Sequence, residues 1–166
     1  MHKIFFLSLF YLSLHLISCA QSPKTRWVDD IVPDAKLDAN FTICNKEDEA
    51  IQYFNDGKGF EYTGGKYVLD SIFFSRYTQV DLPSATGLIR IRFVVNCRGE
   101  SGRFRLIGMD PTYEEKTFDP SVTDQLLSIT KTLNGWPPKQ WKNTSVDYYQ
   151  YLIFKLEMGQ LKQILP

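Results

Sequence analysis

The chain has 166 residues, and its 19 lysines and arginines balance its 19 aspartates and glutamates, so the formal net charge is zero. This length fits one domain, and zero net charge argues against a nucleic-acid-binding protein and against a protein held to membranes by charge alone. Apolar residues make up 43% and aromatic residues 14% of the chain, which is enough for a folded core and too much for a disordered protein.

The extreme N-terminus predicts a secretory signal. Lys3 gives a positive start, and Ile4 to Ile17 is an uncharged stretch of 14 residues rich in Phe, Leu and Ile. A helix of that length spans about 21 Å, which is shorter than the roughly 30 Å hydrocarbon core of a bilayer. The pattern therefore favours a signal peptide over residues 1–18, against the alternatives of a membrane span or a buried core helix.

The residues that end this stretch predict a lipid anchor. Leu16-Ile17-Ser18-Cys19 resembles a bacterial lipobox, in which the peptide is cut before the cysteine and the thiol is acylated. Buried acyl chains contribute about 0.8 kcal/mol per methylene, and more than one chain anchors stably. The resemblance implies a cell-envelope lipoprotein with its domain in the periplasm or at the surface. No acidic residue directly follows Cys19, which favours the outer membrane over the inner one.

The remaining histidines and cysteines restrict the chemistry further. Both histidines, His2 and His15, lie inside the predicted signal, so the mature chain has no imidazole for acid–base catalysis or zinc binding. Besides Cys19, the mature chain keeps Cys44 and Cys97. In an oxidising compartment this pair predicts a disulfide, which would close a loop of about 54 residues and stabilise the fold by at most about 4 kcal/mol. Two separate buried thiols are the alternative.

Composition divides the mature chain into a linker and a domain. Residues 19–40 are polar and contain four aspartates, which is typical of a lipidated N-terminus followed by a solvated linker. We expect an α+β domain over residues 41–166. At its start, capping residues and apolar spacing predict one helix over residues 45–54 and another over residues 66–77.

A β-hairpin is the clearest structural signal. In Leu88–Val95, apolar residues alternate with Arg90 and Arg92, which predicts a strand with one buried and one charged face. A turn-rich stretch follows, and Arg103–Met109 alternates in the same way. Arg103 and Arg105 would meet the first two arginines across the hairpin, so we expect acidic partners, for example from the linker.

One helix and one long strand complete the domain. Apolar residues at helical spacing predict a helix that begins near Asp119 and ends at Leu133. After Trp136-Pro137-Pro138, alternation over Tyr148–Met158 predicts a strand, and residues 160–165 allow one more short strand.

This order of elements resembles the C-terminal domain of TonB-type energy transducers. The residues that carry the resemblance are Gly87 to Val95, Gly99, the helix from Thr123 to Leu133, Trp136-Pro137-Pro138, and Tyr151 to Leu156 ahead of Gly159. The match covers about residues 68–160, and the wider chain resembles small envelope lipoproteins of Bacteroidota-type bacteria. The resemblance to TonB-type domains implies an antiparallel sheet of three to four strands with helices packed on one face.

The resemblance also implies a function. Domains of this family bind a segment of an outer-membrane receptor as an added strand on a free sheet edge. Here the expected edge is Tyr148–Glu157, and the expected partner contacts are Tyr149, Tyr151, Ile153 and Lys155. If residues 160–165 return as a strand, they cover this edge. The chain also lacks the inner-membrane helix and long proline-rich spacer of an energy transducer, so it would dock proteins rather than transmit force.

Three other patterns suggest rival functions. Ser128 and Lys131 match the Ser-x-x-Lys spacing of penicillin-interacting enzymes, but the second catalytic triplet of such enzymes is missing, so we favour the polar side of an amphipathic helix. An acidic cluster could bind a hard cation, or it forms a solvated loop; its members are Asp110, Glu114, Glu115 and Asp119. Five aromatic residues could stack on carbohydrate or peptidoglycan, or they fill a core; these are Trp136, Trp141, Tyr148, Tyr149 and Tyr151.

We therefore expect a lipid-anchored docking module without enzymatic activity, cofactor or metal. Its partner would be an envelope or outer-membrane protein bound by strand addition, with the membrane contacted through the lipid. The alternatives are a structural envelope lipoprotein, a peptidoglycan- or carbohydrate-binding module and, less favoured, a hydrolase.

Overall fold

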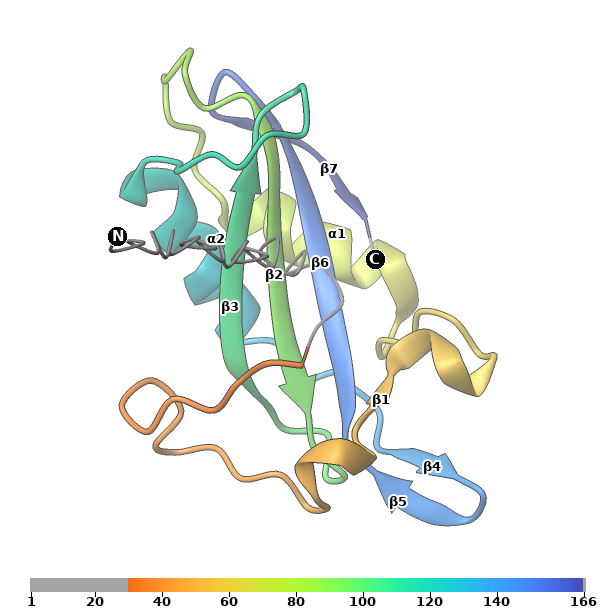
Figure 1. The fold of residues 1–166 in the computed structure, drawn as a ribbon. Helices are drawn as coiled ribbons and strands as arrows, with labels where there is room; N and C mark the ends of the chain where they lie inside the picture. Colours follow the sequence, from red (N-terminus) through yellow and green to blue (C-terminus); the bar gives the residue numbers. More distant parts are fainter. Residues whose placement is uncertain (1–29, 166) are drawn as a thin grey trace, which may run out of the picture. The chain divides into compact units, whose positions relative to one another are not determined.

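The computed structural model describes residues 30–165, and the chain from Ile31 onward forms one compact unit (Figure 1). The predicted signal peptide and the lipidated Cys19 lie outside the described residues. Within residues 30–165, no helix combines the length and the apolar character needed to cross a membrane.

A five-stranded sheet forms the centre of the unit. β2 (Gly87–Val95) and β6 (Tyr148–Glu157) are its middle strands, and β3 (Ser101–Met109) lies antiparallel beside β2. On the other side of β6, β7 (Gln160–Leu165) pairs antiparallel and the two-residue β1 (Ile51–Gln52) pairs parallel. The α+β class is confirmed, whereas the expected purely antiparallel sheet is wrong because β1 makes the sheet mixed.

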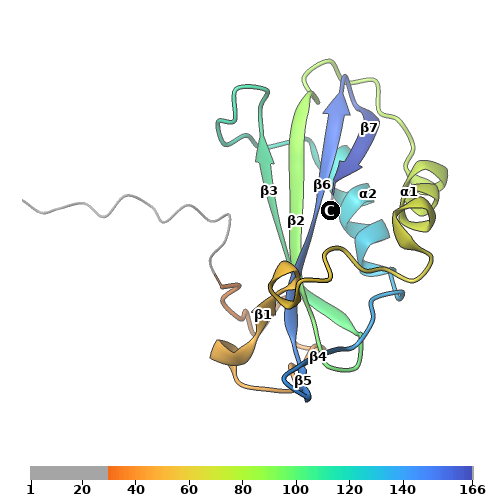
Figure 2. The same ribbon diagram turned by 90° about the vertical axis from the view of Figure 1, so that its right-hand side faces the viewer.

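Two helices cover one face of the sheet (Figure 2). α1 (Gly65–Arg76) and α2 (Pro120–Lys131) agree with the predicted helices, and the Asp119 side chain caps α2 by accepting a 2.8 Å hydrogen bond from the Ser121 amide. Alternate residues of the middle strands point at the helices. The fully buried side chains of this core include Leu69, Phe73, Ile89, Ile91, Phe93, Leu126, Leu152 and Phe154.

The helix predicted over residues 45–54 does not form. Instead, two short 3₁₀ turns, η1 (Glu47–Glu49) and η2 (Tyr53–Asp56), flank β1. The Ile51 amide donates to the Asp147 carbonyl at 3.0 Å, and Ile51 pairs with Tyr148. A helix this short is marginal on its own, so the pairing with β6 decides the backbone.

The opposite face of the sheet is covered in part by residues 31–45, which we call the N-terminal segment (Figures 1 and 2). Ile31 is only 4% exposed and packs with Val94 and Tyr149. A Cβ atom on Gly102 would lie 2.1 Å from the Phe41 ring, so glycine allows this close approach. Residues 31–40, expected to be solvated linker, thus belong to the packed unit.

Ion pairs join this segment and η1 to the edge of the sheet. Both Arg105 guanidinium nitrogens bond to the Asp38 carboxylate, at 2.6 and 3.0 Å. Arg103 binds Glu47 in the same forked way, at 2.5 and 2.8 Å. The expectation of acidic partners, one of them from the linker, is confirmed for Arg103 and Arg105. Arg90 and Arg92 are buried instead, and their guanidinium groups lie over the rings of Tyr151 and Tyr149, so β2 has no exposed charged face.

We predict that Arg105→Met destabilises the protein by about 2 kcal/mol at pH 7, because it leaves the Asp38 carboxylate poorly solvated and without its cation. The bonded guanidinium lowers the pKa of Asp38. The pKa of Asp38 is lower in the folded chain than its value of about 4 in the unfolded chain, so the ionised carboxylate stabilises the fold at pH values above about 4. This contribution is lost as the pH falls below about 4 and through the folded-state pKa. Urea unfolding at several pH values should therefore show the difference between the variant and the native chain shrinking with acidification.

Arg98→Met is the matched control. The pair between Arg98 and Glu100 has both side chains more than half exposed, so its removal should change stability by less than about 0.5 kcal/mol. Equal effects of the two substitutions would contradict the role given to Asp38.

Candidate functional site

The strand expected to offer a free edge lies inside the sheet. β2 pairs with β6 from Gly87 opposite Leu156 to Val95 opposite Tyr148. On its other side, β6 pairs with β1 at Tyr148 and Tyr149 and with β7 from Ile153 to Glu157. The prediction that Tyr148–Glu157 is the docking edge is therefore wrong, because β7 and β1 occupy most of the main-chain groups that a partner would need.

The four expected partner contacts share the sheet face away from the helices, but they differ in access. Tyr149 is buried beneath the N-terminal segment. Tyr151 is partly exposed and lies under the Arg90 guanidinium, 4.0 Å from the ring centre. Ile153 is also partly exposed, and Lys155 is exposed, with 48% of its side chain accessible. These residues do not form one accessible contact surface.

Among the described residues, the sheet ends on one side at β3, which has no strand beside its outer edge (Figure 1). The Lys116 amide donates to the Gly108 carbonyl at 2.9 Å, so the main chain of Gly108 faces outward. Because main-chain groups alternate sides along an antiparallel strand, Leu106 and Phe104 face outward as well. Toward the other end, Arg103 has a φ of 56° and interrupts the extended backbone. The regular stretch without a neighbouring strand is Phe104–Ile107, in which the Phe104 carbonyl already accepts a 3.0 Å hydrogen bond from the Arg105 guanidinium. The outward amide and carbonyl that remain for a partner are those of Leu106.

The side chains at this open stretch give it a distinct chemistry. Phe104 and Leu106 are partly buried and pack against the core on the helix side. The Lys131 ammonium of α2 lies 6.0 Å from the Phe104 ring centre and, among residues 30–165, has no carboxylate within 4.0 Å. The other face presents Arg105, whose charge Asp38 neutralises. The edge thus offers main-chain hydrogen bonds, apolar contacts and one exposed cation.

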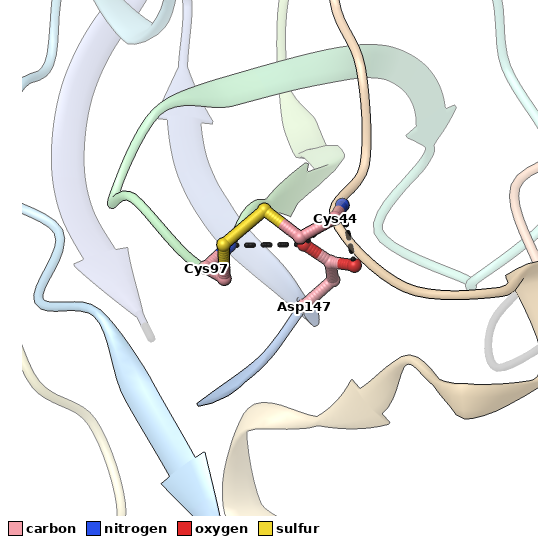
Figure 3. Close-up of side chains that lie close together, drawn as sticks. All are labelled: Cys44, Cys97 and Asp147. Carbon is pink, nitrogen blue, oxygen red and sulfur yellow. Dashed lines mark hydrogen bonds between the residues drawn. A yellow bond between two sulfur atoms is a disulfide. The ribbon is translucent and has the colours of Figure 1, made fainter. Parts of the chain in front are cut away.

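The predicted disulfide is confirmed, and it surrounds an unexpected carboxylate (Figure 3). Cys44 and Cys97 are bonded, and the fully buried Asp147 carboxylate accepts backbone hydrogen bonds from both of them and from Asn45, at 2.8 to 3.1 Å. Within the described residues this is the one group of three with metal-ligand spacing. Because the two sulfurs are bonded to each other and the oxygens already accept amides, the group is structural rather than a metal site.

The structure does not assemble the serine–lysine pair. Ser128 is exposed and lines a shallow cavity with Arg76, between the two helices. Lys131 instead lies over Phe104 at the sheet edge, and no hydrogen bond joins it to Ser128 within the described residues. The two side chains therefore do not form a nucleophile and base in this structure.

The acidic and aromatic candidates are likewise dispersed. Asp110 accepts hydrogen bonds from Thr112 and from the Glu114 amide, and Asp119 caps α2, so each carboxylate orders its own turn. The four acidic residues do not meet at ligand distance within the described part of the chain. Of the five aromatic candidates, Trp136, Tyr148 and Tyr149 are buried, whereas Trp141 is 39% exposed and Tyr151 partly so.

Sequence reasoning missed both Asp147 and the β3 edge. Asp147 directly precedes the run of tyrosines that opens β6, and a lone acidic residue before a buried strand is the signal that points to it. No local pattern identifies the edge, because it depends on which strands cover β6.

No family model, curated protein or solved structure matches the chain. The resemblance to TonB-type domains therefore rests on the order of elements and stays a prediction.

We predict that Asp147→Asn destabilises the protein by about 2–3 kcal/mol. The variant keeps the shape of the side chain, but it turns one acceptor into a donor that faces backbone amides, and it removes charge-assisted hydrogen bonds. Urea unfolding of the oxidised protein measures the loss. Asp48→Asn on the exposed η1 turn is the control and should have little effect. Equal stability of native and Asp147→Asn chains would show that the carboxylate does not hold this junction.

Proposed function

We propose that the chain is a lipid-anchored protein of the cell envelope whose TonB C-terminal-like domain docks an envelope or outer-membrane protein. In this proposal the partner adds a strand to β3 rather than to β6. The observation that carries the proposal is the regular, open stretch Phe104–Ile107 beside α2.

The edge supports a defined mode of binding. An extended peptide beside β3 would accept a hydrogen bond from the Leu106 amide and donate one to the Leu106 carbonyl. Its side chains would alternate between the helix side, with Phe104 and Leu106, and the opposite side, with Arg105 and Ile107. Since Lys131 lies at the rim, an acidic residue on the helix side of the peptide would add electrostatic complementarity.

Two features support the proposed location. The sequence that ends at Cys19 resembles a lipobox, and the disulfide between Cys44 and Cys97 is of the kind that persists in oxidising compartments. Because the chain packs from Ile31 onward, only residues 20–30 separate the anchor from the domain. Eleven residues extend at most about 40 Å, so the partner segment must lie near the membrane surface.

We predict that Leu106→Pro abolishes peptide binding while Leu106→Ala retains most of it. Both variants lose the leucine side chain, but only proline removes the outward amide, and an edge position tolerates this without breaking the pairing with β2. The assay follows backbone NMR shifts of the full chain as a short peptide of alternating Val and Thr with one Glu is added. The native chain should show its largest shifts at Phe104–Ile107.

A second peptide with N-methylated backbone amides is the matched ligand control and should not bind. Shifts confined to other elements, or equal binding by the proline and alanine variants, would exclude strand addition at β3.

We predict that Cys19→Ser moves the protein out of the membrane fraction of an expressing bacterium. The native chain should begin at residue 19 and carry a mass increase from acyl chains, because the thiol is the attachment atom of the proposed lipid. Mass spectrometry and detergent phase partition measure both properties. A native chain that retains residues 1–18 with an unmodified thiol would refute the anchor without touching the argument about the edge.

A further inference from the structure

The hairpin of β4 (Lys139–Trp141) and β5 (Thr144–Val146) forms a separate two-stranded sheet that projects from one end of the domain (Figure 1). Trp141 forms one wall of a cavity of about 410 Å³ beside this hairpin. We propose that this cavity, which we call the Trp141 groove, binds a pyranose ring of a glycan. The inference is independent of strand addition at β3.

The base of the hairpin is held firmly. The Lys139 side chain is only 3% exposed, and its ammonium binds the carboxylates of Asp56 and Glu61 at 2.5 and 2.9 Å. It also donates to the Tyr53 carbonyl at 3.2 Å. At the other strand, Val146 is buried. An isolated two-stranded hairpin is marginally stable in water, so these contacts are what fix the position of Trp141.

The tip of the hairpin has the twist that such a connection requires. Lys142 and Asn143 form the two-residue loop, and both have positive φ values, 48° and 62°. This is the pattern of a type I′ turn, which matches the twist of the flanking strands. This turn sets Trp141 opposite Thr144 in the hairpin.

The lining of the groove suits a sugar ring. Ile51, Val146 and Trp141 contribute its apolar lining, Trp141 with an aromatic ring. Its polar lining consists of Asn45, Glu49, Lys142 and Thr144. A pyranose has an apolar face of C–H groups, which can stack on an indole, and a belt of hydroxyl groups, which donate and accept hydrogen bonds. A groove with one aromatic platform and mixed donors and acceptors meets both requirements.

The distribution of exposed apolar side chains favours a glycan over a protein at this groove. Trp141 is the one large exposed apolar residue that lines it. The other exposed aromatic residues lie on other elements: Tyr67 and Phe74 on α1, Phe54 on η2 and Tyr113 in the turn after β3. A single exposed ring is smaller than the contiguous apolar area typical of protein interfaces, whereas it is enough to stack one sugar.

The test uses the full chain in a detergent without a sugar headgroup, with chitotetraose and cellotetraose as probes. The chain has three tryptophans, and the Trp141→Ala variant identifies the indole N–H resonance of Trp141. We expect saturable shifts of that resonance with at least one probe, and a loss of affinity of tenfold or more in Trp141→Ala. Trp141→Phe should retain part of the binding, because it keeps an aromatic face.

Phe54→Ala is the control, since Phe54 is a similarly exposed aromatic residue outside the groove, and it should bind like the native chain. Unchanged spectra outside the hairpin confirm that each variant folds. Three results would each overturn the proposal: no Trp141 shift with either probe, equal sugar affinity in Trp141→Ala, or shifts at Trp141 with the Val–Thr peptide but not with sugars.

Discussion

The junction around the Asp147 carboxylate is the constraint on which the rest of the structure depends. This one buried anion accepts backbone amides from Cys44 and Asn45 in the N-terminal segment and from Cys97 in the turn between β2 and β3. Its own carbonyl accepts the amide that starts β1. Segments that are far apart in the sequence therefore meet where β6 begins. The disulfide closes the same junction covalently, so hydrogen bonds and a covalent bond enforce one geometry.

That junction decides which sheet edge stays open. By fixing Ile51 beside the start of β6, it places β1 along one part of that strand, and β7 covers the other part after a tight turn. A strand with neighbours on both sides cannot accept a further one there. The open main-chain groups are consequently those of β3, on the far side of β2.

The sequence predicted the helices and strands whose residues carry a local pattern. It did not predict the segments whose conformation depends on contacts with residues far away in the chain. Alternation predicted β2, β3 and β6, and helical spacing predicted α1 and α2, because each signal lies within one element. The residues 45–54 failed as a helix because Ile51 pairs with Tyr148, and no local pattern reports that contact. Residues 31–40 failed as a solvated linker for a similar reason, since Asp38 has the composition of a linker residue and its partner, Arg105, lies in β3.

The open edge of the sheet could not be located from the sequence. The resemblance to TonB-type domains led us to expect binding at a sheet edge, which stays a prediction, whereas the identity of the open edge needed the pairing of β7 and β1. The aromatic residues show the same limit. Trp136 and Trp141 are five positions apart and equally suited to sugar stacking by type, yet one is buried under the sheet and the other lines a groove. Residue type identifies which aromatic side chains could bind a sugar, but only the packing of the fold shows which of them are accessible.

The open edge also has to avoid indiscriminate pairing between molecules. Charged side chains commonly protect such edges, but Asp38 and Glu47 neutralise the arginines of β3, so charge repulsion alone does not guard this one. The short length of the open stretch limits such pairing instead. The bridge between Met109 and Glu115 closes one end, and the left-handed backbone of Arg103 closes the other. Four residues remain, which is too short for extensive sheet growth. In the proposed strand addition they are long enough to set the register of a short peptide, and Lys131 at the rim would favour an acidic one.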